Sequence, residues 1–182
     1  MSSESNPVQP VPSDDPIRNR VAESPLVTLD LEAIFPVRQA VLDVAQWCPD
    51  GIVREKEFRA ALLAFDCESI RDAAVAVHNP SGCILPQWVP ALVAVHLAQA
   101  ALFVAWCSPS ALLDTYYAHR MAQLDGEPFR GRPVLIKGCG KHPVPESAYA
   151  AAAAALRPVA KSVLYGEACS TVPLFKNTSP TV

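Results

Sequence analysis

The sequence has little of what a nucleic-acid-binding surface or a secretory leader needs. Lys and Arg number 15 against 18 Asp and Glu, and the closest basic group, Arg54, Lys56 and Arg59, is interleaved with Glu55 and Glu57. A solvated helix face explains that group, so binding to nucleic acid is not expected. The first ten residues contain neither a basic region nor an apolar run, so a secretory signal is not expected.

Closely paired cysteines are also absent. The six cysteines are spread along the chain, and no two of them form a Cys-x-x-Cys pair. Without a leader sequence, we interpret them as free thiols in a reducing compartment and expect a cytoplasmic protein. Residues 89–106 are nearly all apolar, but Pro90, His96 and Gln99 interrupt the run, which favours a buried helix and strand over a membrane span.

Composition divides the chain into an ordered region and two tails. Residues 1–20 are rich in Pro, Ser and Asp and are expected to be disordered, and residues 177–182 are expected to fray. The hydrophobic fraction of the whole chain, 51%, is that of a globular protein. Residues 21–176 are therefore expected to form a single α/β domain.

The apolar pattern predicts an α/β fold. Residues 27–32 alternate like a half-buried strand, 40–44 is a second short candidate, and 54–65 has helical spacing. Three apolar strands then recur at roughly thirty-residue intervals, the length of a β-α-β unit, at 73–77, 102–107 and 134–137. Right-handed crossovers would place them in one largely parallel open sheet with helices on both faces, preceded by one or two N-terminal strands.

Helix boundaries follow from proline, serine and glycine. The three crossover helices are expected to begin near Pro86, at Ser108–Pro109 and near Pro145. Pro158 is expected to kink or split the last helix, and Gly166 to end it in a left-handed C-cap. The segment after Gly166 is expected to dock as an extended strand, to close over a site, or to do both.

Ligands of open parallel sheets bind outside the carboxyl ends of the strands, and thiols and imidazoles gather there in this sequence. These side chains are ligands for zinc and iron–sulfur clusters. Cys169 follows the last helix and is expected to fold back toward the same edge. The candidate metal ligands are Cys139, Cys169, Cys83 and His142.

Structural interpretations stand beside these. A free cysteine often acts as a small apolar residue, and for Cys48 and Cys67, away from the predicted edge, this interpretation is favoured. The loop G-C-G-K-H is not a P-loop, because His142 stands where Ser or Thr is required; a backbone nest for an anion stays open. His96 is expected in the core, His119 at the surface, and the three tryptophans as core or loop anchors.

Two segments carry a family resemblance. I-K-G-C-G-K-H-P-V-P-E-S-A-Y and G-E-A-C-S-T-V-P-L-F-K resemble the motifs I-K-G-C, P-V-P-x-S-A-Y and G-E-x-C-S-T-V-P-L-[YF]-K of an uncharacterised bacterial family, a domain of unknown function. R-V-A-E-S-P-L-V-T-L-D-L-E is similar to the family's opening, so the resemblance runs from about Asn19 to Lys176. The family's cysteine before the first crossover helix falls here at Asn79, so a third thiol is lost or moved to Cys83.

The resemblance implies a function near iron–sulfur assembly, because the family's genes often lie beside those of the Suf system. It implies an accessory factor in cluster or metal-linked processes that uses Cys139 and Cys169, with iron–sulfur assembly proteins as partners and a cluster or zinc as cofactor. Two alternatives stay open. One is a non-catalytic interaction module with structural cysteines, and the other is a small-molecule enzyme with a thiol nucleophile and His142 as its base.

Overall fold

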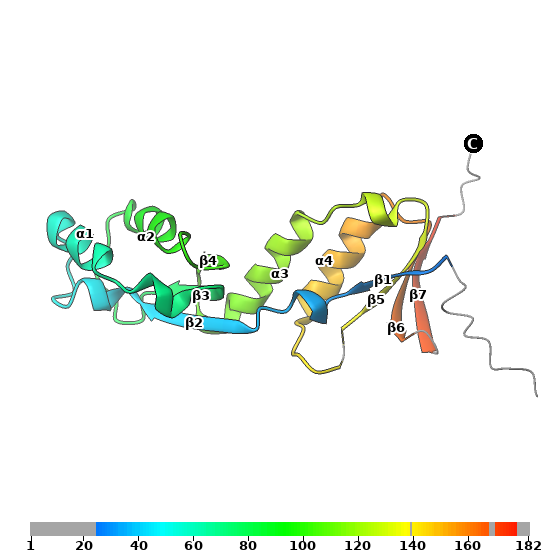
Figure 1. Cartoon of the computed structure of the whole chain (residues 1–182), viewed down its shortest axis with the longest axis horizontal. Coiled ribbons are helices and arrows are strands. Elements are labelled where there is room, and N and C mark those ends of the chain that lie inside the picture. The colour runs from blue at the N-terminus through cyan, green and yellow to red at the C-terminus, as the bar shows by residue number, and fades with distance from the viewer. Residues whose placement is uncertain (1–24, 139, 168–169, 178–182) are drawn as a thin grey trace, which may run out of the picture.

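The computed structural model describes residues 25–138, 140–167 and 170–177, so the expected tail at 1–20 lies outside the described residues. The molecule is elongated and holds two open sheets (Figure 1). The parallel sheet has the order β2-β3-β4, with β2 (Arg38–Asp43), β3 (Ala73–His78) and β4 (Phe103–Trp106). The mixed sheet has the order β1-β5-β6-β7, with β1 (Val27–Asp30), β5 (Pro133–Lys137), β6 (Ser162–Glu167) and β7 (Ser170–Lys176). The expected α/β class is confirmed.

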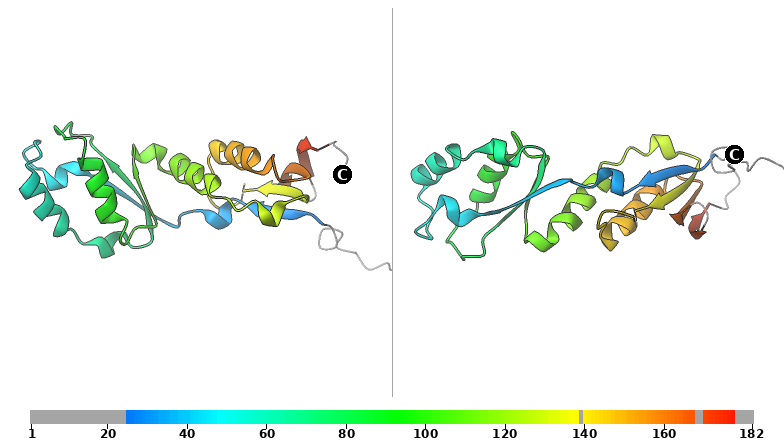
Figure 2. Two further views of the ribbon diagram at one scale, coloured as in Figure 1. Left: turned by 90° about the horizontal axis from the view of Figure 1, so that it is seen from above. Right: turned by 60° about the horizontal axis from the view of Figure 1, so that its bottom comes forward.

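Four α-helices lie within the described residues: α1 (Glu55–Leu63), α2 (Val89–Leu97), α3 (Leu112–Ala122) and α4 (Glu146–Leu156). Helices α1 and α2 gather with the parallel sheet at one end of the molecule, and α4 lies with the mixed sheet at the other (Figures 1 and 2). The apolar run 89–106 is a helix and a strand, as expected. No helix in the described ranges is both long and apolar enough to span a membrane.

Strand β3 separates two cores by the alternation of its side chains. Val75 and Val77 pack with α1 and α2 in one cluster, and Ala74 and Ala76 pack with α3 in the other. Side chains alternate between faces along a strand, so the sequence A-A-V-A-V turns small residues to one helix layer and larger ones to the other. Helices therefore cover both faces of this sheet.

Helix α3 lies between the two sheets. Tyr116, Tyr117 and Met121 are buried in the same cluster as alanines of β3 and β4 and as apolar residues of β1, β5, β6 and α4. The Tyr117 hydroxyl donates a hydrogen bond of 2.8 Å to the carbonyl oxygen of Leu31, just after β1. One helix thus packs against the parallel sheet and is tied to the chain that leaves the mixed sheet.

Two expectations from the sequence are wrong. The strands at 73–77, 102–107 and 134–137 do not share a sheet, because β5 pairs with β1 and β6 instead of with β4. Gly166 does not cap a helix: α4 ends at Leu156, two residues before Pro158, and Gly166 lies within β6 with a φ of +119°. Val163 and Tyr165 of β6 face the helices, so the segment satisfies a strand pattern.

The C-terminal segment forms strand β7, antiparallel to β6, which confirms the expectation that it docks as an extended strand.

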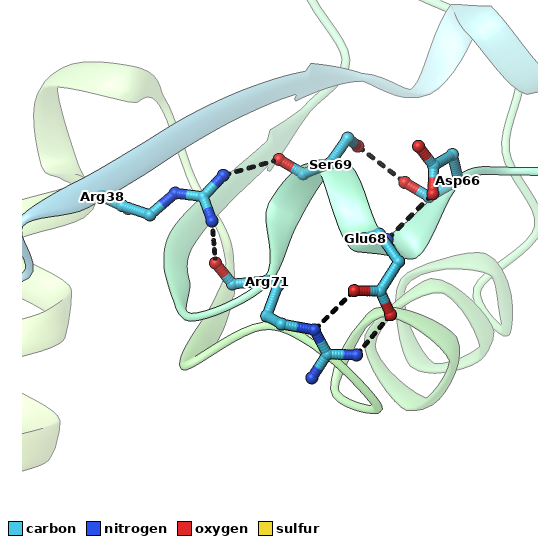
Figure 3. Close-up of polar contacts among 5 residues, drawn as sticks. All are labelled: Arg38, Asp66, Glu68, Ser69 and Arg71. Carbon is cyan, nitrogen blue, oxygen red and sulfur yellow. Dashed lines mark hydrogen bonds and ion pairs between the residues drawn. The ribbon is translucent and has the colours of Figure 1, made fainter.

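The start of the parallel sheet is held by Arg38 (Figure 3). Its guanidinium donates to the carbonyl oxygens of Arg71 at 2.7 Å and Ser69 at 3.2 Å, both in the turn that leads into β3. Within that turn Arg71 pairs with Glu68, and the Asp66 carboxylate accepts from the Glu68 amide at 3.0 Å. These bonds set the point at which β3 begins beside β2.

Candidate functional site

The described residues that flank Cys139 and Cys169 lie at one edge of the mixed sheet. Strand β5 ends at Lys137, two positions before Cys139, and in sequence Cys169 falls between the end of β6 at Glu167 and the start of β7 at Ser170. Strands β5 and β6 are parallel neighbours with Ile136 opposite Tyr165, so their carboxyl ends lie side by side. Cys139 and Cys169 themselves lie outside the described residues.

The loop after β5 is fastened by a carboxylate. Glu32, in the short 3₁₀ helix η1 (Glu32–Ile34), accepts hydrogen bonds from the backbone amides of Gly140 and Lys141, the latter at 2.9 Å. The amides of Lys141 and Gly140 lower the pKa of Glu32, because they stabilise its charged form. The anion nest that the sequence left open is therefore occupied by a side chain of the same protein.

Neighbouring groups hold Glu32 and the loop in place. The Asp30 carboxylate accepts from the Glu32 amide at 3.0 Å and lies 3.4 Å from the Lys137 ammonium, its register partner on β5. A Cβ added at Gly138 would lie 3.0 Å from the Tyr149 hydroxyl, and one added at Gly140 would lie 2.9 Å from the Glu32 carboxylate. A residue with a side chain at either position would press on these neighbours, so glycine on each side of Cys139 lets the loop approach them closely.

His142 lies in the same loop and is exposed. Its ring stacks on Phe35, just after η1, with centroids 4.4 Å apart and planes 9° from parallel. No hydrogen bond joins the imidazole to any described residue. Its nitrogens are available to a ligand, and its ring position is set by the stack.

Gly166 lies in β6 close to the start of β7. Its φ of +119° is a conformation that residues with a side chain rarely adopt, and an added Cβ would collide with the Ser170 carbonyl oxygen. The close pairing of β6 with the start of β7 therefore depends on glycine at this position.

Cys83, the remaining candidate ligand, lies elsewhere. It is buried in the cluster under α1 and α2, beside Cys48, whereas the His142 loop contacts η1. The Asn79 side chain accepts from the Cys83 amide at 2.8 Å and donates to its carbonyl oxygen at 2.9 Å. Asn79, where the resemblance led us to expect a thiol, thus fixes the loop with its amide. Over the described ranges, no three His, Cys, Asp or Glu side chains converge as a metal site.

Three further cysteines are poor nucleophiles. Burial, aided by the neighbouring Cys83 thiol, raises the pKa of Cys48 to about 11. Burial also raises the pKa of Cys67, and it raises that of Cys107 against a smaller opposite effect of the Thr115 hydroxyl. These thiols stay protonated near neutral pH, and the reactive form is the thiolate.

Two positions of the structure were not singled out by the sequence, Glu32 and Trp106. Glu32 is 108 residues from the amide it binds, so no local pattern could have revealed the contact. Trp106 was expected to be an anchor, but its side chain is 40% exposed at the end of an edge strand. Trp47, by contrast, is buried as expected. The Nε2 atom of His96 is buried without a partner among the described residues, so a fully satisfied core histidine is not what is seen.

Comparison with known proteins gives one match. The profile of a family described as a protein of unknown function (DUF2480) matches residues 15–177. No curated protein and no solved structure matches the chain.

Proposed function

Since the chain belongs to the DUF2480 family, whose description assigns no activity, we propose from its own residues that it is an accessory protein that holds a soft metal or an iron–sulfur cluster through Cys139 and Cys169. The observation that carries the proposal is the pairing of β5 and β6, whose carboxyl ends lead directly into the two cysteine segments. Residues 137–138 and 166–167 are neighbours at one edge, although far apart in sequence.

The contacts that hold the loop after β5 support a specific role for the Cys139 thiol. Glu32 binds two backbone amides after Cys139, and glycine on both sides of that residue lets the loop approach Tyr149 and Glu32 closely. A cysteine that served only as a small apolar residue would not need an exposed loop fastened in this way. Fixed backbone is what a ligand side chain needs to meet a metal at a set distance.

The chemistry of the donors suits a soft metal, and their number suits a metal that can be exchanged. Thiolates and imidazole bind zinc and iron, and Cys139, Cys169 and His142 provide three donors at most. A closed structural zinc site has four protein ligands. A site with three leaves a coordination position for a partner protein or a small thiol, as a carrier requires.

Anaerobic purification with metal analysis tests this proposal. The wild-type protein is purified without oxygen, incubated with ferrous iron and sulfide or with zinc, and desalted. Metal content and the visible spectrum are then measured. We expect bound metal in the wild type, loss of it in the double variant Cys139→Ser, Cys169→Ser, and retention in the matched control Cys67→Ser, whose thiol is half-buried elsewhere.

Two results contradict the proposal. One is a wild-type protein that retains no metal and has no cluster absorption after reconstitution. The other is equal metal retention in the wild type and in a folded double variant. In either case a non-catalytic interaction module with structural cysteines becomes the better description. The thiol-enzyme alternative gains no support from His142, whose imidazole stacks on Phe35 and makes no hydrogen bond to a described residue.

A further inference from the structure

The parallel sheet has a hollow at its carboxyl edge, apart from the cysteine segments. Its volume is about 370 Å³, within the range of small-molecule sites, roughly 300–1,000 Å³. Half of its lining ends or follows β3 and half ends or follows β4: His78, Asn79, Pro80, Trp106, Cys107 and Ser108. The hollow thus lies where two neighbouring parallel strands end.

The connections leaving these two strands diverge. The chain after β3 enters α2, which packs on the face of Val75 and Val77. The chain after β4 enters α3, which packs on the opposite face, with Ala74 and Ala76. Adjacent strands whose connections go to opposite faces leave a crevice between them at their carboxyl ends, the edge at which open α/β sheets bind their ligands. Topology and the hollow point to the same place.

Both walls of the hollow are fixed. On the β3 side, the Asn79 side chain makes two hydrogen bonds to the backbone of Cys83, which closes the loop. On the β4 side, the Cys107 amide donates to the Val77 carbonyl oxygen at 3.1 Å, which continues the ladder past Trp106. A ligand would meet an ordered site and would lose little binding energy to ordering it.

The lining favours an uncharged ligand with a flat ring. No Lys, Arg, Asp or Glu lines the hollow. The carboxylate of Asp43, opposite His78 on β2, is already bonded to the Ala45 amide and the Ser81 hydroxyl. A phosphate would therefore find no cation, and an organic cation no free carboxylate.

Two polar groups that line the hollow could form hydrogen bonds with a ligand. Neither the half-buried His78 imidazole nor the Trp106 indole N–H is hydrogen-bonded to another residue within the described ranges. The indole face offers a stacking surface beside Pro80, and the imidazole offers a donor or an acceptor at its edge. We propose that this hollow binds a neutral heteroaromatic ring of the nucleobase type, stacked on Trp106 and hydrogen-bonded to His78.

Adenosine is the probe that tests this site, with AMP and tetramethylammonium as charged comparisons. Titrations of the full chain are followed by heteronuclear NMR of the three tryptophan indole N–H signals. We expect adenosine to shift the Trp106 signal saturably and to bind more tightly than AMP. Because stacking on an aromatic side chain contributes a large share of such binding, Trp106→Ala should weaken it about tenfold. His78→Gln should weaken it as well, without touching the edge strand.

Control variants distinguish binding in the hollow from binding elsewhere on the protein. Trp88→Phe changes a tryptophan outside the hollow and should leave adenosine binding unchanged, as should the double variant Cys139→Ser, Cys169→Ser. The proposal is overturned if adenosine produces no saturable shift of the Trp106 signal, if a folded Trp106→Ala variant binds as the wild type does, or if AMP or tetramethylammonium binds more tightly than adenosine. If Trp106→Ala does not fold, the adenosine titrations of the wild type and of His78→Gln test the proposal.

Discussion

Replacing Tyr117 by phenylalanine removes one hydroxyl from the centre of the molecule. Tyr117 is fully buried, and its hydroxyl is the hydrogen-bond donor to the Leu31 carbonyl oxygen at 2.8 Å. Burial raises the pKa of this phenol to about 12, so it is a neutral donor at any working pH. Phenylalanine fills nearly the same volume, so the change leaves a buried acceptor unpaired without opening a large cavity.

The size of the effect follows from that unpaired carbonyl. A buried acceptor without a partner costs about 1–3 kcal/mol, and we expect Tyr117→Phe to lower the free energy of unfolding by about 2 kcal/mol. For a chain of this length, that corresponds to a fall in Tm of roughly 4–8 °C. The assay is thermal unfolding followed by circular dichroism at pH 7.

A neighbouring tyrosine provides the matched control. Tyr116 is also buried, but its hydroxyl has no hydrogen-bond partner among the described residues. Tyr116→Phe should therefore change Tm by much less than Tyr117→Phe. Equal losses in the two variants would refute the reasoning, because the loss would then come from the missing hydroxyl itself and not from the bond to Leu31.

Three further predictions concern the loops and the sheet edge. Because the folded-state pKa of Glu32 is lowered, its carboxylate stabilises the protein above its ordinary pKa, and this stability is lost as the pH falls through the lowered pKa. The NMR chemical shift of the Gly140 amide should report this titration, and Glu32→Gln should abolish it. Gly166→Ala should destabilise the protein by about 2 kcal/mol or more in denaturant titrations, and an unchanged midpoint would contradict the assigned backbone conformation. Arg38→Ala should cost about 1 kcal/mol, more than the control Arg59→Ala, whose hydrogen bond joins it only to exposed Glu55.

Elements held together by local pattern could be predicted from the sequence. The alternation over 27–30, the helical spacing over 55–63 and the apolar runs of β3, β4 and β5 are visible in the residues themselves. Each of these elements formed close to its expected range. Local propensity and tertiary burial agree there, so the pattern was sufficient.

Sheet membership could not be predicted, because spacing does not encode it. The interval from β3 to β4 is nearly the same as that from β4 to β5, yet only the first connection returns to its own sheet. The difference lies in α3, which packs against the face opposite α2 and is followed by β5, the strand that pairs with β1. Such a choice depends on which surfaces are left to bury, and that is a property of the whole chain.

The candidate site was predictable in part for the same reason. The cysteine segments are recognisable as motifs, and Gly138 and Gly140 signal close approach. What they approach, Glu32 and Tyr149, is set by contacts across the fold. The crevice between the ends of β3 and β4 was likewise hidden until the faces covered by α2 and α3 were known.

The position of α3 has a consequence for how the molecule comes apart. Its buried residues belong to a core shared by both sheets, so detaching either sheet would expose tyrosine and methionine side chains to water. That exposure costs free energy, and because the core is shared, it destabilises both ends of the elongated molecule. Melting at one end is thereby transmitted to the other, and the protein should lose its structure in a single cooperative step.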